Sequence, residues 1–312
     1  MGENSKIEWT HHTFNPWIGC QKVGSGCDHC YAEAMMDTRL GRVDWGPHAS
    51  RSRTSAAYWR QPLKWDREAA AAGERRRVFC ASLADVFDNH GSITSGWRGD
   101  LWHLIARTPN LDWMLLTKRP GNIKSMLPDG YGAPAWGGGW PNVWLGCTVV
   151  NQAEANRDIP KLLAVPAAVR FLSMEPLLGP VDIERVYMDV VDCAFGETAN
   201  MHGLDLIIAG GESGRGARAM HPDWVRSLRD QCQAAGVAFF FKQWGEWAPS
   251  TQAAATGNPR SGWKCLAGHP HIPKAAELYP EAGAAFIAHV GKSRAGRLLD
   301  GRTWDQMPGA PQ

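Results

Sequence analysis

The chain has 312 residues, 44% of them hydrophobic, and its 33 basic and 31 acidic residues give a net charge of +2. This length allows one large domain or two ordinary ones, and the balanced charge favours no particular class of partner. Eight cysteines are too few for a disulfide scaffold, and the amino terminus lacks the apolar stretch of a signal peptide. With no apolar run of about 18 residues, we expect no membrane contact and a reducing, cytoplasmic location.

Three of the eight cysteines lie close together near the amino terminus. Residues 9–17 form a candidate first strand, and Cys20, Cys27 and Cys30 follow it at C-x6-C-x2-C spacing, before a helix-like run over 31–40. The spacing is compatible with a metal site, a cluster site, or a thiol pair with a bystander. Structural zinc needs a fourth ligand, for which His11, His12 and His29 are candidates, whereas three thiolates on a [4Fe–4S] cluster leave one iron open.

A basic stretch follows the cysteine loop and forms part of a predicted insertion over 41–77. Aromatic residues (Tyr58, Trp59 and Trp65) are interleaved with its cations, and this pattern is typical of a surface that follows a phosphate backbone and stacks on bases. A partly helical, solvated insertion explains the pattern as well. The cations are Arg51, Arg53, Arg60, Lys64, Arg67, Arg75, Arg76 and Arg77.

The middle of the chain alternates short apolar runs with helix-like stretches. The runs are continuous rather than alternating, which is typical of strands buried on both faces of a parallel sheet. We therefore predict a complete or partial parallel (β/α) barrel over 1–248, with an open doubly wound sheet as the competing architecture, and a linker and small extension over 249–312. The runs are 78–83, 113–117, 143–150, 169–174, 204–210 and 237–242, and the stretches are 95–108, 151–165 and 221–236.

Polar residues follow nearly every predicted strand, and this favours the barrel. The carboxyl ends of barrel strands converge on one mouth, where such folds place their active sites. Lys118 and Arg119 would bring two cations there, suited to a carboxylate or phosphate. The glycines of the 210–213 segment would expose N–H groups toward a phosphate or adenine, although a tight turn explains them too. Separately, Cys265, His269 and His271 have a loosely metal-like spacing without a clear fourth ligand.

The cysteine loop resembles that of radical S-adenosylmethionine (SAM) enzymes, in which three cysteines hold a [4Fe–4S] cluster. The usual spacing there is C-x3-C-x2-C, so this chain has three extra residues in the first interval, and His29 stands where an aromatic hydrophobic residue is usual. A closer resemblance covers nearly the whole chain. The motifs NPW-x-GC, GC-x-x-CYAE, SLADVF, LLTKRP, MEPLLGP, IIAGGESG, FFKQWGEW and LDGRTWDQMP are similar to those of an uncharacterised family often carried by phages and grouped with radical SAM proteins.

The resemblance implies a barrel of radical SAM type with SAM on the open iron of a cluster held by Cys20, Cys27 and Cys30. Reductive cleavage of SAM, with electrons from a reductant protein, would then start radical chemistry on an unknown substrate, with nucleic acid as one candidate. The alternative is a zinc-stapled nucleic-acid-binding or hydrolytic protein. From their positions at strand ends, the residues predicted to bind SAM are Ser82, Asp85, Glu175, Gly210, Gly211, Glu212 and Ser213, and the predicted catalytic residues are Glu175 and Lys118.

Overall fold

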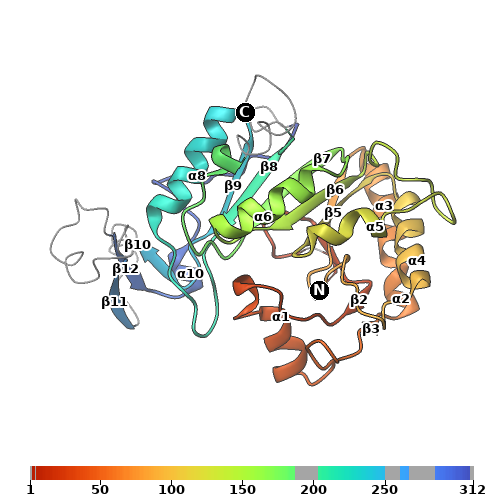
Figure 1. The fold of residues 1–312 in the computed structure, drawn as a ribbon, viewed down its shortest axis with the longest axis horizontal. Coiled ribbons are helices and arrows are strands. Elements are labelled where there is room, and N and C mark those ends of the chain that lie inside the picture. The colour runs from red at the N-terminus through yellow and green to blue at the C-terminus, as the bar shows by residue number, and fades with distance from the viewer. Residues whose placement is uncertain (1, 4, 187–202, 250–260, 267–284, 310–312) are drawn as a thin grey trace. The chain divides into compact units, whose positions relative to one another are not determined.

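The computed structural model describes residues 2–3, 5–186, 203–249, 261–266 and 285–309. The chain divides into two compact units. The first comprises residues 1–148, 158–172 and 203–205, and the second comprises 149–157, 173–202 and 206–312. Figure 1 traces the chain through both units.

The first unit is built on parallel strands in which polar and apolar residues do not alternate. β1 (His12–Phe14), β4 (Arg76–Cys80), β5 (Leu111–Thr117) and β6 (Val143–Thr148) pair in parallel in that order. One register line joins Phe14, Cys80, Leu115 and Leu145, and all four side chains are fully buried. Burial on both faces explains why these runs read as continuous apolar segments.

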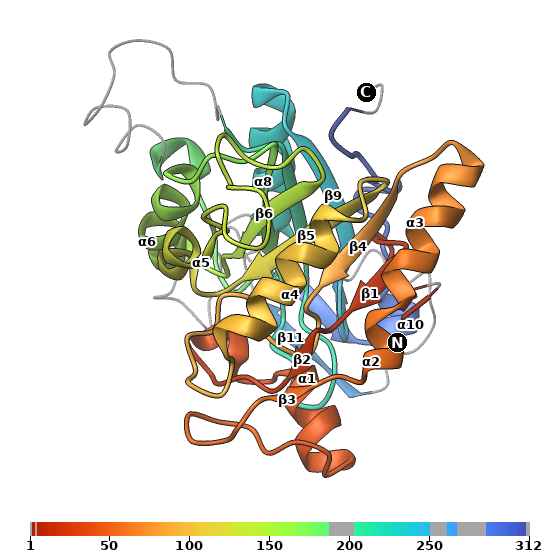
Figure 2. The same ribbon diagram turned by 90° about the vertical axis from the view of Figure 1, so that its right-hand side faces the viewer.

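Helices of the first unit lie against this sheet, as Figure 2 shows for α3 (Gln61–Ala72) and α4 (Ser95–Ala106). The Thr94 hydroxyl caps α4 by accepting from the Trp97 amide, and Gly73 ends α3 in the left-handed conformation. The remaining elements are short: β2 (Trp17–Ile18), β3 (Ser52–Arg53), α1 (Tyr31–Glu33), α2 (Ala56–Trp59), α5 (Ile123–Met126), the 3₁₀ turns η1 (Ser25–Cys27) and η3 (Pro120–Asn122), and the π-helical η2 (Ala34–Arg39).

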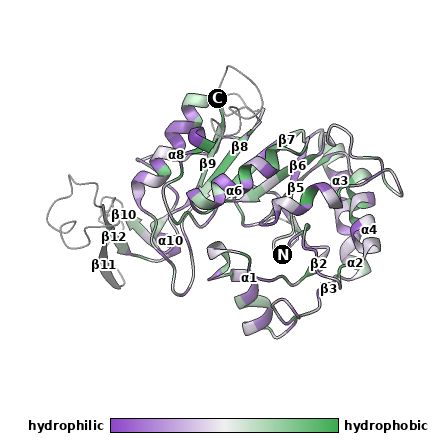
Figure 3. Ribbon diagram, viewed as in Figure 1, coloured by the Kyte–Doolittle hydropathy of each residue, from purple (hydrophilic) through white to green (hydrophobic). Residues whose placement is uncertain are grey.

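The second unit contains the parallel pair β8 (Leu206–Gly210) and β9 (Ala238–Gln243), with α8 (Pro222–Ala235) between them in the chain. His221 caps α8, and Gly236 ends it with φ 68°. β10 (Trp247–Pro249), β12 (Ala285–His289) and β11 (Ser261–Leu266) form a small antiparallel sheet in that order, followed by α10 (Lys292–Ala295). Strands β8 and β9 are among the most hydrophobic segments in Figure 3.

The carboxyl-terminal segment of the second unit runs along the edge of β9. The Phe241 amide donates to the Trp304 carbonyl, and the Gln306 amide donates to the Phe239 carbonyl. This pairing assigns a structural role to the LDGRTWDQMP motif, because it covers an edge strand that would otherwise expose unpaired backbone groups.

The seven described strands of the main sheet follow the order β1-β4-β5-β6-β7-β8-β9, where β7 is Val169–Met174 and α6 (Gln152–Leu163) precedes it. This sequential order is that of a (β/α) barrel, because a doubly wound sheet reverses direction at a switch point. β1 and β9 stand at the two ends of the order, as in a partial barrel. The structure thus confirms a mixed α/β fold with a parallel sheet, and the predicted runs coincide with its strands.

No described helix combines the length and the apolar character needed to cross a bilayer.

The first residue of β1, His12, is a buried histidine. The His12 ring is 2% exposed and stacks on the Trp65 ring of α3 with a centroid distance of 4.4 Å and an interplanar angle of 7°. Neither ring nitrogen has a hydrogen-bond partner within the described residues. Burial, reinforced by the nearby Arg76, lowers the pKa of His12 to about 4.

This low pKa predicts a loss of stability in mild acid. Between pH 6.5 and 4 the unfolded chain binds a proton at His12 that the folded chain does not. The free energy of unfolding therefore decreases as the pH is lowered through this range, by up to about 1.4 kcal/mol per pH unit. His12→Phe, which keeps the stacked ring, should remove this slope in denaturant titrations, whereas His48→Gln at an exposed histidine should not. An unchanged slope in His12→Phe would contradict the assignment.

Candidate functional site

The three clustered cysteines lie in the first unit on one loop after β2. Gly19 starts the loop with φ 111°, and a Cβ there would press on Val43 and Arg51 at 3.2 and 3.1 Å. Cys27 ends η1 and Cys30 caps α1, so both flank the single turn between these elements. All three thiols are free.

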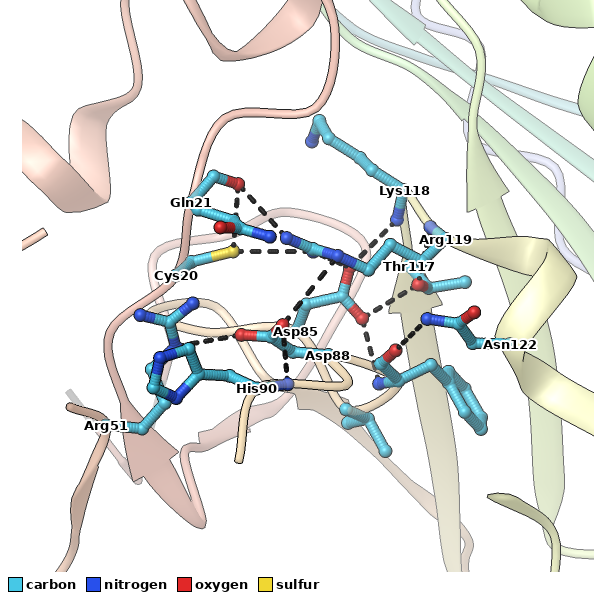
Figure 4. Close-up of polar contacts among 12 residues, drawn as sticks. Cys20, Gln21, Arg51, Asp85, Asp88, His90, Thr117, Lys118, Arg119 and Asn122 are labelled. Carbon is cyan, nitrogen blue, oxygen red and sulfur yellow. Dashed lines mark hydrogen bonds and ion pairs between the residues drawn. The ribbon is translucent and has the colours of Figure 1, made fainter. Parts of the chain in front are cut away.

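Arg119, which follows β5, connects this loop to the strand ends. Its guanidinium Nη1 lies 3.6 Å from the Cys20 Sγ and 3.0 Å from the Asp85 Oδ2, and its Nη2 donates to the Gln21 carbonyl at 3.2 Å. Figure 4 shows the guanidinium between the thiol and the carboxylates. The Arg119 side chain is only 8% exposed, so this cation is a fixed part of the site.

The Asp85 carboxylate holds Arg119 in place. Its Oδ1 accepts from the Thr117 hydroxyl at 2.7 Å and the Phe87 amide at 2.9 Å, and its Oδ2 accepts from the Lys118 amide and from Arg119. Four donors fill the acceptor positions of this carboxylate. The geometry gives Asp85 a positioning role, and the predicted contact to the amino group of SAM would require one of these bonds to be exchanged.

A second buried ion pair supports the first. Arg51 and Asp88 are both fully buried, with Nε and Oδ2 2.8 Å apart, and Arg51 Nη1 also donates to the Gly46 and Ala49 carbonyls. The Arg119 Nε lies 3.8 Å from the Asp88 Oδ1, which joins the two pairs. We call Cys20, Arg51, Asp85, Asp88 and Arg119 the thiol–arginine network.

The network controls the charge state of Cys20. Burial and, to a smaller extent, the Asp85 carboxylate together raise the pKa of the Cys20 thiol to about 11, while Arg119 opposes both. A thiol with this pKa carries little negative charge at neutral pH. Cys20 is therefore unreactive as it stands and becomes a thiolate readily only when a further positive charge, such as a metal, approaches it.

The thiol–arginine network predicts opposite effects of two substitutions on Cys20. Arg119→Met removes the charge that stabilises the thiolate and should slow iodoacetamide labelling of Cys20 between pH 7 and 9.5, while Asp85→Asn should accelerate it. Labelling would be followed peptide by peptide in metal-free protein. Lys118→Ala is the matched control, because the Lys118 ammonium contacts the Thr148 hydroxyl instead. Faster labelling in Arg119→Met with slower labelling in Asp85→Asn would refute the electrostatic account.

A smaller hydrogen-bonded group lies at the end of β4. The Ser82 hydroxyl accepts from the Asn15 side-chain amide at 3.1 Å, and the Asn15 Oδ1 accepts from the Leu83 amide at 2.7 Å. The Tyr31 hydroxyl donates to the Ser82 carbonyl at 2.6 Å, which ties α1, and with it Cys30, to this strand end. Ser82 thus lies in the first unit beside the cysteine loop, and Asn15 is a site residue that sequence reasoning missed.

The other predicted site residues lie in the second unit. Glu212 is held by Arg218, which donates to its Oε2 from the amide and Nε at 2.7 and 2.9 Å and to its Oε1 from Nη2 at 2.6 Å. Ser213 follows on the same loop. Glu175 lies 3.1 Å from the Lys242 ammonium, measured from Oε1 to Nζ. Lys242 is a second residue missing from the predicted set.

The glycines of the 210–213 segment have a packing explanation. A Cβ on Gly211 would lie 2.0 Å from the Trp244 carbonyl oxygen, and a Cβ on Gly245 would lie 2.0 Å from the Glu212 carbonyl oxygen. Two backbone segments therefore pass each other at a distance that only glycine permits. The predicted phosphate or adenine contact stays a prediction, since packing alone accounts for glycine here.

The close approach predicts that Gly211→Ala lowers the free energy of unfolding by about 3 kcal/mol, because two backbone segments must separate. Gly99→Ala is the control, since Gly99 is exposed in α4 with nothing within 4 Å of the added atom, and it should stabilise by about 0.5–1 kcal/mol. Denaturant unfolding of both variants measures the difference, and equal effects would contradict the packing account.

Most cations of the basic stretch form ion pairs or hydrogen bonds within the protein. Arg51 is buried, Arg53 pairs with Asp100, and Arg77 donates to the Trp9 carbonyl. Lys64, Arg75 and Arg76 also pair with carboxylates. Arg60 and Arg67 are the two cations of the stretch that lack such a partner within the described residues.

Its aromatic residues pack inward rather than toward solvent. Trp65 is fully buried against His12, and Tyr58 and Trp59 stack on or abut Phe14. Trp65 is therefore not available for the predicted stacking on bases, and Arg51 is not available for a phosphate contact.

The described residues contain no group of three His, Cys, Asp or Glu side chains close enough to hold a metal ion as they stand. Two of the histidines considered for zinc are occupied elsewhere: His11 Nδ1 accepts from the Arg77 amide, and His12 stacks on Trp65. The donor set itself suits an iron–sulfur cluster, because three free thiols share one loop beside a buried cation. His269 and His271, considered with Cys265, lie outside the described residues.

The fold and the network define an α/β protein with a thiol-bearing site at the carboxyl edge of its parallel strands. The chain belongs to the family described as Protein of unknown function (DUF5131), whose match covers residues 4–308. No curated protein matches it. Among solved structures, a malate synthase ternary complex with pyruvate and acetyl-CoA from Haloferax volcanii has 12% identity and a TM-score of 0.34. The match covers 56% of this chain and 53% of that one.

Proposed function

We propose that the protein is a radical SAM-type enzyme whose Cys20, Cys27 and Cys30 hold a [4Fe–4S] cluster. The observation that carries the proposal is the position of the Cys20 thiol, held by Arg119 at the carboxyl ends of β4 and β5. Active sites of (β/α) barrels lie at this edge of the sheet. When bound, the cluster would supply the electron that cleaves SAM, delivered by a reductant protein in a reducing cytoplasm.

The residues of the chain prepare this site in three ways. Arg119 neutralises part of the negative charge that three thiolates would bring, and Asp85 fixes the orientation of Arg119. The Tyr31 hydroxyl, through its bond to the Ser82 carbonyl, anchors the turn that carries Cys30. The raised pKa of Cys20 keeps the thiol protonated and protected until a metal displaces the proton.

The residues predicted to bind SAM fall into two groups. Ser82 and Asp85 belong to the first unit with the cysteines, and Lys118 in the same unit is proposed to face an anionic group of the substrate. Glu175, Gly210, Gly211, Glu212 and Ser213 belong to the second unit. Their proposed contact with the nucleoside, and a proton-donating role for Glu175, rest on the positions of these residues at strand ends.

A nucleic-acid substrate is a further part of the proposal, and it now has a smaller basis. A contact through Arg51–Arg77 would depend on Arg60 and Arg67 and on Lys64 and Arg75, whose side chains are about half exposed and whose surface ion pairs are weak enough to exchange. The zinc-stapled alternative and a phage origin also remain open proposals.

The proposal is tested by anaerobic reconstitution with iron and sulfide. The protein should bind four irons per chain, show the brown absorbance and the reduced-state EPR signal of a cluster, and cleave SAM to methionine and 5′-deoxyadenosine when reduced. Cys20→Ala, Cys27→Ala and Cys30→Ala should each abolish SAM cleavage, because an incomplete cluster cannot deliver the electron.

The matched controls are Cys80→Ala, Cys147→Ala and Cys232→Ala, three buried cysteines outside the loop, which should retain the cluster. Loss of the chromophore in these controls would overturn the ligand assignment. A colourless protein with one tightly held zinc and no 5′-deoxyadenosine would replace the proposal with the zinc-stapled alternative.

A further inference from the structure

The second unit contains an ion pair at the carboxyl ends of its strands. Glu175 directly follows β7, and Lys242 lies near the end of β9, with the carboxylate Oε1 and the ammonium Nζ 3.1 Å apart. The two side chains are 13% and 20% exposed, so they are mostly withdrawn from water but reachable from it.

Glu175 has unused hydrogen-bonding capacity. Its buried Oε1 lies 3.1 Å from the Lys242 ammonium but makes no hydrogen bond of acceptable geometry within the described residues, and its Oε2 accepts only from the Ser173 hydroxyl at a long 3.4 Å. Asp85 and Glu212 differ, because each is surrounded by well-placed donors. A mostly buried carboxylate with so few well-aligned donors costs free energy, and such a group in a native protein calls for an explanation.

The backbone around the pair is adapted to the carboxylate. A Cβ on Gly210, at the end of β8, would lie 2.8 Å from the Glu175 Oε1 and 3.3 Å from the Gln243 carbonyl oxygen. Glycine at this position therefore lets the carboxylate lie directly against the strand end. The ammonium of Lys242 has three N–H donors, and Glu175 is its one ion-pair partner among the described residues.

We propose that Glu175 and Lys242 bind the zwitterionic head group of an α-amino acid. Glu175 accepts from the ammonium group of the ligand, and Lys242 donates to its carboxylate. A ligand with only one of these charges would take one partner and leave the other half-buried and uncompensated. A zwitterion satisfies both partners and leaves the net charge of the site unchanged, so it is the ligand class that this pair discriminates best.

The inference goes beyond the proposed function and replaces the nucleoside contact and the proton-donating role given to Glu175 there. It needs neither the cluster nor its cysteines, so it is tested on the full-length, cluster-free protein. The probes are the twenty standard L-amino acids, followed by saturation-transfer NMR. At least one should bind. For that amino acid, the corresponding amine without the carboxylate and the acid without the amino group should bind at least tenfold more weakly.

Variants assign the binding to the pair. Glu175→Gln and Lys242→Met should each weaken binding at least tenfold, and Lys242→Arg, which keeps the charge, should retain most of it. Arg226→Gln is the matched control, because it breaks an exposed ion pair on α8 of the same unit. Thermal unfolding of each variant distinguishes loss of binding from loss of fold.

Three results would overturn the inference: binding of none of the twenty amino acids, equal binding of the amine or the acid alone, or unchanged binding in both Glu175→Gln and Lys242→Met. Each of these is independent of whether the protein forms a cluster.

Discussion

The buried guanidinium of Arg119 is the contact on which the first unit depends most. Removing a cation from water is costly, and the cost is offset here by the carboxylates of Asp85 and Asp88 and by a backbone carbonyl. Because Asp85, which follows β4, accepts from the Thr117 hydroxyl at the end of β5, the network links the segments at these two strands beyond their ladder bonds. The cysteine loop is attached to this rigid group through Cys20.

Three carboxylates near strand ends differ in the hydrogen-bond donors that surround them. Asp85 and Glu212 are surrounded by donors, and this identifies them as parts of the scaffold. Glu175 has an ion-pair partner, the Lys242 ammonium, but no well-aligned donor within the described residues. Since buried polar groups in native proteins are nearly always satisfied, the exception marks where a ligand could complete the set. The donors around each carboxylate thus distinguish carboxylates with a structural role from those that can bind a ligand, and they do so more clearly than the positions of the residues in the fold.

The basic stretch shows how local composition misleads when partners are distant in the chain. Arg51 pairs with Asp88 and Arg75 with Asp112, each 37 residues away. In the linear sequence these cations look like an unbalanced run, because their acids lie in other segments. The folded stretch is mainly a set of ion pairs around packed aromatic rings, and Arg60 and Arg67 are the two cations in it without an ion-pair partner among the described residues.

By itself the sequence determined the approximate positions of the strands, because continuous apolar runs are local signals that do not depend on distant partners. It left a barrel and a doubly wound sheet as alternatives, and the order of the strands in the folded sheet decided between them. The sequence also placed Cys20, Cys27 and Cys30 on one loop and polar residues at the strand ends. Only the tertiary structure decided which of those polar residues are free to act. That Asp85 is saturated, that Gly211 is required by the Trp244 carbonyl, and that Lys242 meets Glu175 all follow from contacts between segments 30 to 70 residues apart. Such contacts are set by the pairing of whole strands, and no local pattern in the chain encodes them.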